Sequence, residues 1–239
     1  MGMCDKHGKY DAFVEVLGRK IPQPHCPRCV DEKIKEKEKK EKEAEQRAWI
    51  YKLRAASGVP PRYKDKRISD IDENPSTQQA LRWIRRYLEV LPERLSVGAS
   101  GSFCGDCGTG KTLIGCVMVN EIVELAHSAR YTTAWQMIQD IRKAYTHKDI
   151  SVSGQIQSFI SPRFLVIDEI GVQSGTNDER VLLYQVIDGR YSAMKSTILI
   201  SNLNSPVEDG FLDARTVDRL RENGGFNLVL SGESYRAKS

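Results

Sequence analysis

From about residue 76 onward, short apolar runs alternate with longer segments in which apolar residues recur at helical spacing. The helical spacing predicts helices over residues 76–91, 111–126, 135–145 and 178–192. The short apolar runs predict strands that lead up to Phe103 and that span residues 129–134, 163–168 and 197–201. The polar stretch 146–157 predicts a surface loop. Strands that alternate with helices predict an α/β fold, with a parallel sheet and helices on both of its faces.

The chain before residue 57 has a different pattern. Residues 31–47 contain seven acidic and seven basic residues, and several Glu and Lys stand four positions apart, which is typical of a solvated helix. Gly58, Pro60 and Pro61 then end the helical pattern. We therefore expect three parts: an N-terminal module over residues 1–30, a charged helical linker over 31–56, and an α/β domain over 57–239.

Composition narrows the class of protein. The chain has 239 residues, of which 40% are hydrophobic and 28% charged, as in a soluble globular protein. No apolar run approaches the ~18 residues that a membrane span needs, and the first ten residues are too polar for a signal peptide. The six cysteines do not follow a secreted disulfide pattern, so we expect a cytoplasmic protein without membrane contact. The net charge of +4 permits contact with nucleic acid.

One segment fits the pattern of a phosphate-binding loop, which is Gly, any four residues, Gly, Lys, then Ser or Thr. Its residues are Gly105, Asp106, Cys107, Gly108, Thr109, Gly110, Lys111 and Thr112. Such a loop turns its backbone N–H groups toward one anion, and the following helix adds its positive end. Lys111 would reach the outer phosphates and the Thr112 hydroxyl would hold Mg²⁺. The pattern predicts ATP or GTP binding, against the alternative of a chance glycine-rich turn.

A second motif points to hydrolysis. The apolar run Phe164–Ile167 ends in Asp168 and Glu169, and predicts a buried parallel strand followed by two carboxylates. We expect Asp168 to hold Mg²⁺ and Glu169 to deprotonate the attacking water. An ordinary solvated turn would have the same composition, but the phosphate loop earlier in the chain favours the catalytic interpretation.

The N-terminal module carries metal-ligand spacing. Cys4 and His7 form one pair and Cys26 and Cys29 another, each with two residues between its members. Such pairs suit tetrahedral Zn²⁺, and metal binding would supply folding energy that so short a segment lacks. His25 competes with His7 as the fourth ligand. The alternative is a set of reduced, unconnected side chains near the terminus.

Over residues 48–236 the order of motifs resembles the DnaC-type replicative helicase loaders, which are AAA+ ATPases and close relatives of the IstB transposition ATPases. The phosphate loop and the strand ending in Asp168-Glu169 are shared with many other ATPases. The motifs that carry the resemblance to this family are residues 57–63 (Ser-Gly-Val-Pro-Pro-Arg-Tyr), 199–204 (Leu-Ile-Ser-Asn-Leu-Asn), 214–220 (Ala-Arg-Thr-Val-Asp-Arg-Leu) and 234–236 (Ser-Tyr-Arg).

The resemblance implies an AAA+ ATPase domain over residues 57–239 and assigns roles that spacing alone could not. Asn202 matches the sensor-1 position, which contacts the γ-phosphate or the attacking water. Arg219 matches the arginine finger that reaches a neighbouring subunit's nucleotide, with Arg215 as the weaker candidate. Arg236 matches sensor 2, which contacts phosphate within its own subunit.

The resemblance also implies partners. Such loaders hold a replicative helicase through their N-terminal part, contact single-stranded DNA, form homo-oligomers through the finger in trans, and hydrolyse ATP slowly with stimulation by DNA. The Cys-His module departs from the common pattern, so what it contacts is left open. Two alternatives remain at this point: an IstB-like transposition accessory ATPase that binds duplex DNA, and a nucleotide-dependent scaffold with almost no turnover. Glu169 argues against the scaffold, because a protein that only binds nucleotide needs no base there.

Overall fold

The computed structural model describes residues 1–146, 149, 151–171, 176–203 and 214–232. The chain forms two compact units, Met1–Trp49 and Ile50–Ser239. Helix α1 (Pro27–Ala56) begins in the first unit and ends in the second.

The first unit consists of two antiparallel hairpins and most of α1. Strands β1 (Gly2–Cys4) and β2 (Gly8–Tyr10) form one hairpin, and β3 (Phe13–Val16) and β4 (Arg19–Pro22) form the other. Ion pairs at i,i+4, such as Glu36 with Lys40 at 2.7 Å, run along the exposed side of α1. The helix was predicted from its Glu and Lys spacing, whereas the hairpins were not, because they contain almost no alternating apolar pattern.

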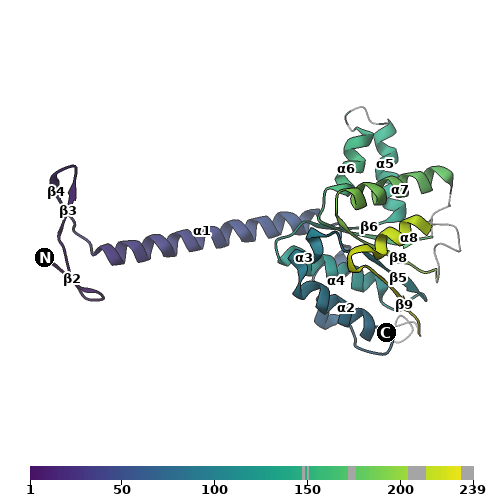
Figure 1. Ribbon diagram of the computed structural model, residues 1–239, viewed down its shortest axis with the longest axis horizontal. Coiled ribbons are helices and arrows are strands. Elements are labelled where there is room, and N and C mark those ends of the chain that lie inside the picture. Colours follow the sequence, from purple (N-terminus) through teal and green to yellow (C-terminus); the bar gives the residue numbers. More distant parts are fainter. Residues whose placement is uncertain (147–148, 150, 172–175, 204–213, 233–239) are drawn as a thin grey trace. The chain divides into compact units, whose positions relative to one another are not determined.

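The second unit is built on one parallel sheet. Its strands are β5 (Gly101–Gly105), β6 (Ala129–Thr133), β7 (Phe164–Ile170), β8 (Ser196–Ser201) and β9 (Phe226–Leu230). They lie in the order β6-β7-β8-β5-β9, and every neighbouring pair is parallel (Figure 1). This arrangement confirms the predicted α/β fold.

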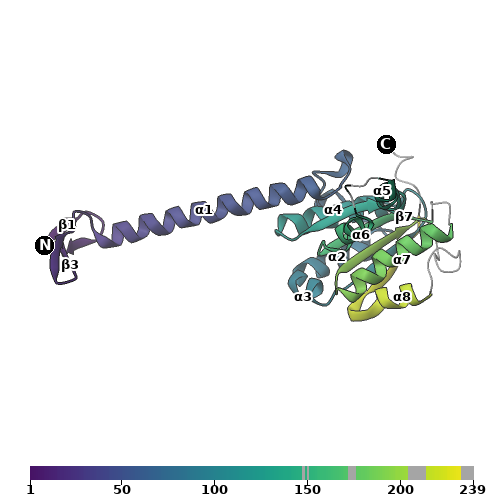
Figure 2. The same ribbon diagram turned by 90° about the horizontal axis from the view of Figure 1, so that it is seen from above.

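Helices cover both faces of the sheet (Figure 1, Figure 2). They are α2 (Gln78–Glu89), α3 (Leu91–Ser96), α4 (Lys111–Glu124), α5 (Ala134–Thr146), α6 (Val152–Ile160), α7 (Asn177–Ser192) and α8 (Ala214–Arg221), with short 3₁₀ turns at Pro61–Tyr63, Ile68–Asp70 and Glu222–Gly224. In the described part of the chain, no helix is both long and apolar enough to cross a membrane.

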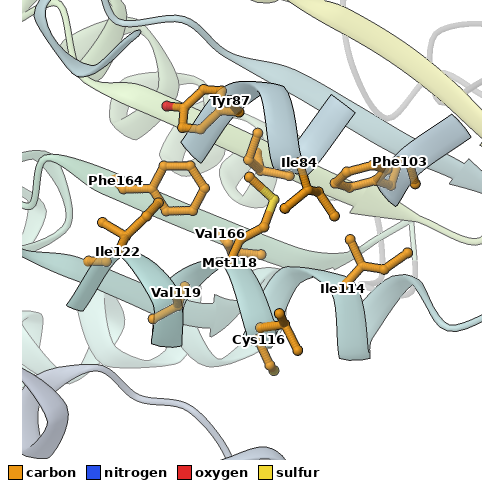
Figure 3. Close-up of a cluster of buried hydrophobic side chains, with 14 of the residues drawn as sticks. Ile84, Tyr87, Phe103, Ile114, Cys116, Met118, Val119, Ile122, Phe164 and Val166 are labelled. Carbon is orange, nitrogen blue, oxygen red and sulfur yellow. The ribbon is translucent and has the colours of Figure 1, made fainter. Parts of the chain in front are cut away.

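Strand β7 shows how the two cores are separated. Successive side chains of a strand point to opposite faces. Phe164 and Val166 therefore join the core beneath α2, α3 and α4, while Leu165 and Ile167 join the core beneath α5, α6, α7 and α8. Figure 3 shows the first of these cores, where Phe164 and Val166 meet side chains of α2 and α4. Because β7 is buried on both faces, its sequence is a continuous apolar run rather than an alternating one.

Two local predictions need correction, and one strand was missed. The loop predicted over residues 146–157 is partly wrong, because α6 begins at Val152. Its apolar contacts come from Val152, Ile156 and Phe159, one face of a short helix. The helix predicted over 76–91 ends at Glu89, and α3 begins at Leu91 as a separate helix with Pro92 in its first turn. Strand β9 was not predicted, although its burial alternates residue by residue.

Arg190 of α7 connects the segment that precedes β7 to β8 at one end of the sheet, and among the described residues its hydrogen-bond partners are carbonyls and a hydroxyl rather than a carboxylate. Its side chain has no exposed surface. The guanidinium donates to the carbonyls of Phe159, Ile160 and Pro162 at 2.8–3.0 Å, to the Ser196 carbonyl at 2.6 Å, and to the Thr197 hydroxyl at 2.9 Å. Burial lowers the pKa of Arg190 to about 9, which still leaves it cationic at neutral pH. The charge is balanced by carbonyl dipoles at the C-terminal end of α6, where a cation is stabilised.

We expect Arg190→Met to destabilise the protein by roughly 3–5 kcal/mol, because it leaves several buried carbonyls without a donor. Chemical denaturation monitored by circular dichroism would measure this. Arg180→Met is the matched control, since Arg180 lies on the same helix and is exposed; its effect should stay within about 0.5 kcal/mol. Equal effects of the two substitutions would contradict the structural role of Arg190.

Candidate functional site

A cavity of about 330 Å³ lies at the edge of the sheet where the strands end. Strand β8 lies between β5 and β7. The segments after these three strands therefore meet at one place, as is common for ligand sites in parallel sheets. The cavity is lined by Arg62, Tyr63, Cys107, Gly108, Gly110, Lys111, Thr112, Leu113, Asp168, Glu169 and Asn202.

The loop between β5 and α4 has the conformation that an anion-binding turn requires. Gly105, Gly108 and Gly110 have φ angles of 112°, 83° and 93°, a region that residues with side chains rarely adopt. A Cβ on Gly105 would also lie 2.3 Å from the carbonyl oxygen of Leu230. Helix α4 starts at Lys111 directly after this loop, so its N-terminal N–H groups face the cavity, as at known phosphate sites.

Lys111 is a buried cation, with 4% of its surface exposed. Its Nζ donates to the carbonyls of Gly105 at 2.8 Å and Asp106 at 2.5 Å, and the Thr109 hydroxyl donates to the same Asp106 carbonyl at 2.9 Å. Burial lowers the pKa of Lys111, since an apolar environment disfavours the charged form. The loop thus holds a positive charge beside the cavity, where a phosphate would compensate it.

Asp168 is a buried carboxylate in the wall of the same cavity, with 3% of its surface exposed. Its Oδ1 accepts from the backbone N–H of Glu169 at 2.6 Å, and its Oδ2 accepts from the Tyr131 hydroxyl at 2.8 Å. A carboxylate offers about four acceptor positions. Asp168 therefore keeps acceptor capacity for a cation after both of these bonds.

Glu169 differs sharply from its neighbour, because it is exposed and has a φ angle of 59°. The pairing between β7 and β8 shifts its register between Ile167 and Ile170, which marks an irregularity around this residue. Strained backbone of this kind is concentrated at functional sites. The irregularity brings Asp168 and Glu169 both to the cavity wall, although adjacent residues of a regular strand point to opposite faces.

Asn202 follows β8 and lines the same cavity, between the phosphate loop and Asp168. Arg62 and Tyr63 line it too, and sequence reasoning did not propose them as site residues. Both residues belong to the Gly-Val-Pro-Pro-Arg-Tyr segment, which carries part of the family resemblance, so a signal for them is present in the sequence.

The arginines proposed for the site have different positions. Arg219 and Arg215 lie on α8 and do not line the cavity. The Arg219 guanidinium pairs with Asp188 and lies 5.0 Å above the Tyr191 ring, so α7 holds it in place, whereas Arg215 is exposed. Arg236 lies outside the described residues. Gly232, four positions before it, donates its N–H to Asp106 of the phosphate loop at 3.2 Å.

The first unit contains a separate cluster of ligand atoms. The thiols of Cys4, Cys26 and Cys29 and one ring nitrogen of His7 all lie within 4.8 Å of one another. Cys4 and Cys29 sulfurs are 3.4 Å apart, and His7 Nδ1 lies 3.3–3.8 Å from the three sulfurs. With Zn–S bonds of about 2.3 Å and Zn–N bonds of about 2.0 Å, a tetrahedral site has edges of about that length. His25 is not part of the cluster.

Two further contacts suit metal binding by this cluster. The His7 Nε2 lies 3.1 Å from a carboxylate oxygen of Glu32, an arrangement that orients a histidine whose other nitrogen binds metal. The backbone N–H groups of His7 and Lys6 lower the pKa of Cys4, whereas the hydrogen bond with Cys4 raises the pKa of Cys29. Without metal, the thiolate of this pair is therefore favoured on Cys4. The residues present therefore fit a zinc ion.

The chain is similar in sequence and in fold to known replication proteins. The chain is 26% identical to the replicative helicase loader DnaC of Escherichia coli K12 over 183 residues, covering 76% of this chain and 74% of DnaC. Its fold matches a crystal structure of the DnaC helicase loader with a TM-score of 0.58 at 22% identity, over 72% of this chain and all of that one. It also matches the replication initiator DnaA bound to AMPPCP and single-stranded DNA, with a TM-score of 0.61 at 19% identity, over 73% of this chain and about half (51%) of DnaA.

The chain therefore has the fold that the DnaC and DnaA structures share, an α/β fold as predicted. The family described as IstB-like ATP binding protein matches residues 99–239, which is 141 of the 239 residues and includes the phosphate loop, Asp168, Glu169 and Asn202. The chain belongs to this family of IstB-like ATP-binding proteins.

Proposed function

We propose that this protein is an ATPase that loads a replicative helicase onto single-stranded DNA. The observation that carries the proposal is the cavity that joins Lys111, Asp168, Glu169 and Asn202, in a chain whose named relatives include the loader DnaC. The DnaA structure that contains AMPPCP and single-stranded DNA has the same fold. This likeness supports a nucleotide and single-stranded DNA as ligands of the present chain.

The site residues have distinct roles in hydrolysis. The N–H groups of the phosphate loop and the Lys111 ammonium bind the triphosphate. Thr112 and Asp168 hold Mg²⁺, which neutralises charge on the phosphate oxygens when bound. Glu169, exposed at the cavity wall, takes the proton from the attacking water. Asn202 orients that water or the γ-phosphate by hydrogen bonding.

Two arginines complete the proposed site. Arg219 acts in trans as the arginine finger of a homo-oligomer and stabilises charge in the transition state of a neighbouring subunit. Its contacts with Asp188 and Tyr191 hold the guanidinium in one orientation, which lowers the entropy lost when it engages a phosphate. Arg236 contacts phosphate in cis, and the bond from Gly232 to Asp106 keeps the chain near the loop four residues before it.

The first unit contacts the helicase in this proposal, with Zn²⁺ bound by Cys4, His7, Cys26 and Cys29. Its second hairpin exposes several apolar side chains, namely Phe13, Val14, Val16, Leu17 and Ile21, each with more than 40% of its surface accessible. Exposed apolar side chains gathered on one short hairpin suit contact with another protein.

The alternative within the same family is a transposition accessory ATPase that binds duplex DNA. The similarity to DnaC favours the loader. A helicase-loading assay that includes duplex DNA separates the two functions.

For the ATPase, we expect Lys111→Ala to abolish nucleotide binding, because it removes the cation beside the phosphates. Glu169→Gln should bind ATP normally and lower turnover by at least about 100-fold, the contribution of a general base. Fluorescent-nucleotide titration and phosphate release, with and without single-stranded DNA, measure both. Glu89→Gln, an exposed carboxylate of α2, is the control. Turnover at the parent rate in Glu169→Gln would contradict the assignment of the base.

For the metal, we expect about one Zn²⁺ per chain, as four ligands predict. The double change Cys26→Ser, Cys29→Ser should release it, as measured by mass spectrometry of the metal content. Cys104→Ser and Cys116→Ser, buried cysteines of the second unit, should keep a full complement of metal. A zinc content that is unchanged by the double substitution would rule out this site.

For loading, a hexameric replicative helicase from the same organism is mixed with closed circular single-stranded DNA. The helicase should become resistant to salt washing only when this protein and ATP are present. Leu17→Ser, at a position 99% exposed, should weaken loading and leave ATP binding unchanged. Stable retention on duplex circles, with no effect on single-stranded ones, would support the transposition function instead.

A further inference from the structure

The residue that most directly supports Asp168 is Tyr131, on the neighbouring strand β6. The two strands are in register, with Tyr131 opposite Val166 and Thr133 opposite Asp168. The Tyr131 side chain, 6% exposed, lies within the core and directs its hydroxyl to the Asp168 Oδ2 at 2.8 Å. A buried tyrosine hydroxyl normally has a hydrogen-bond partner, and here the partner is the carboxylate proposed to hold Mg²⁺.

The chemistry of this bond suits a fixed donor. A tyrosine hydroxyl, with an ordinary pKa of about 10, carries its proton at neutral pH and therefore donates to a carboxylate. A hydrogen bond to a charged acceptor is stronger than one between neutral groups. The Glu169 N–H holds the other carboxylate oxygen at 2.6 Å. The two donors together fix the plane of the carboxylate and so the direction in which its remaining acceptor positions point.

The backbone of Tyr131 is held from the other side by the segment that follows α1. Its N–H donates to the carbonyl of Ser57 at 2.7 Å. Gly58 has a φ angle of 68°, and a Cβ there would lie 2.4 Å from the Tyr131 carbonyl oxygen. Ser57 is itself anchored to the last turn of α1, because its hydroxyl donates to the Arg54 carbonyl at 2.8 Å. A continuous chain of contacts thus runs from the end of α1 through Tyr131 to Asp168.

We propose that Tyr131 is a positioning residue for the magnesium-binding carboxylate, and that the Ser57–Gly58 segment sets its position. This inference rests on the proposed nucleotide and magnesium site. It extends that site by giving the segment after α1 a physical connection to the metal. Partners of metal-binding carboxylates outside the coordination shell contribute substantially to metal affinity.

The test is Mg²⁺-dependent binding of a fluorescent ATP analogue by Tyr131→Phe, which removes only the hydroxyl. The Mg²⁺ concentration for half-saturation should rise by about 10- to 100-fold, while nucleotide affinity without metal stays unchanged. Electron paramagnetic resonance of bound Mn²⁺ reports the same loss without turnover. Tyr87→Phe is the matched control, since it removes another buried tyrosine hydroxyl, one that faces the Ala99 carbonyl.

Gly58→Ala tests the connection to α1. It should displace the Tyr131 backbone and, like Tyr131→Phe, raise the Mg²⁺ concentration for half-saturation. Gly98→Ala is its control, because Gly98 also has a positive φ, 66°, and a Cβ there would meet the backbone of Met194 instead.

The outcomes distinguish a failure of the proposed magnesium site from a failure of the positioning role of Tyr131. If the parent protein binds nucleotide with no dependence on Mg²⁺, the proposed site is wrong and the role of Tyr131 falls with it. If the parent depends on Mg²⁺ and Tyr131→Phe has the same half-saturation, only the positioning role is overturned. Thermal melting of each variant identifies any change that comes from loss of folding. If Gly58→Ala is folded and has the Mg²⁺ half-saturation of the parent, the proposed connection from α1 to Tyr131 is wrong.

Discussion

Burial of two opposite charges at one edge of a parallel sheet is the constraint on which the second unit depends. Lys111 and Asp168 are each at least 96% buried, and a buried charge is costly unless polar groups surround it. The backbone of the phosphate loop therefore curls around the ammonium, and Tyr131 and the irregular end of β7 enclose the carboxylate. The strand order then matters, because β8 separates β5 from β7 and leaves room between the two charges for a ligand.

The first unit meets a different constraint. Its strands are three or four residues long and leave most apolar side chains exposed, so apolar burial contributes little to its stability. The four ligands are drawn from both ends of the segment, Cys4 and His7 on one side and Cys26 and Cys29 on the other. A metal ion that joins them would close the hairpin region onto the start of α1, and its binding energy would be folding energy.

Much of the architecture could be predicted from local pattern. The apolar run of β7 and the helical spacing of α4 and α7 were sufficient for the α/β fold, and the glycine spacing was sufficient for the phosphate loop. Helix α6 was misplaced because its nine residues, in a polar stretch that contains a glycine, are too few for helical periodicity to stand out. Strand β9 was missed, and Asn227 interrupts its apolar run. The roles of Arg190 and Tyr131 could not be predicted, since each depends on contacts with residues that are distant in the sequence. Arg190 bonds carbonyls near residue 160, and Tyr131 meets Asp168 across a strand pair.

The left-handed backbone at Glu169 has a consequence for how this protein can change over time. An L-residue in that conformation costs roughly 1–2 kcal/mol, a noticeable fraction of the 5–15 kcal/mol that typically separates folded from unfolded states. Glycine would relieve the cost and remove the carboxylate. Selection for stability alone would therefore favour glycine at position 169. Proteins that keep an acidic residue there lose some stability and retain the function of the carboxylate.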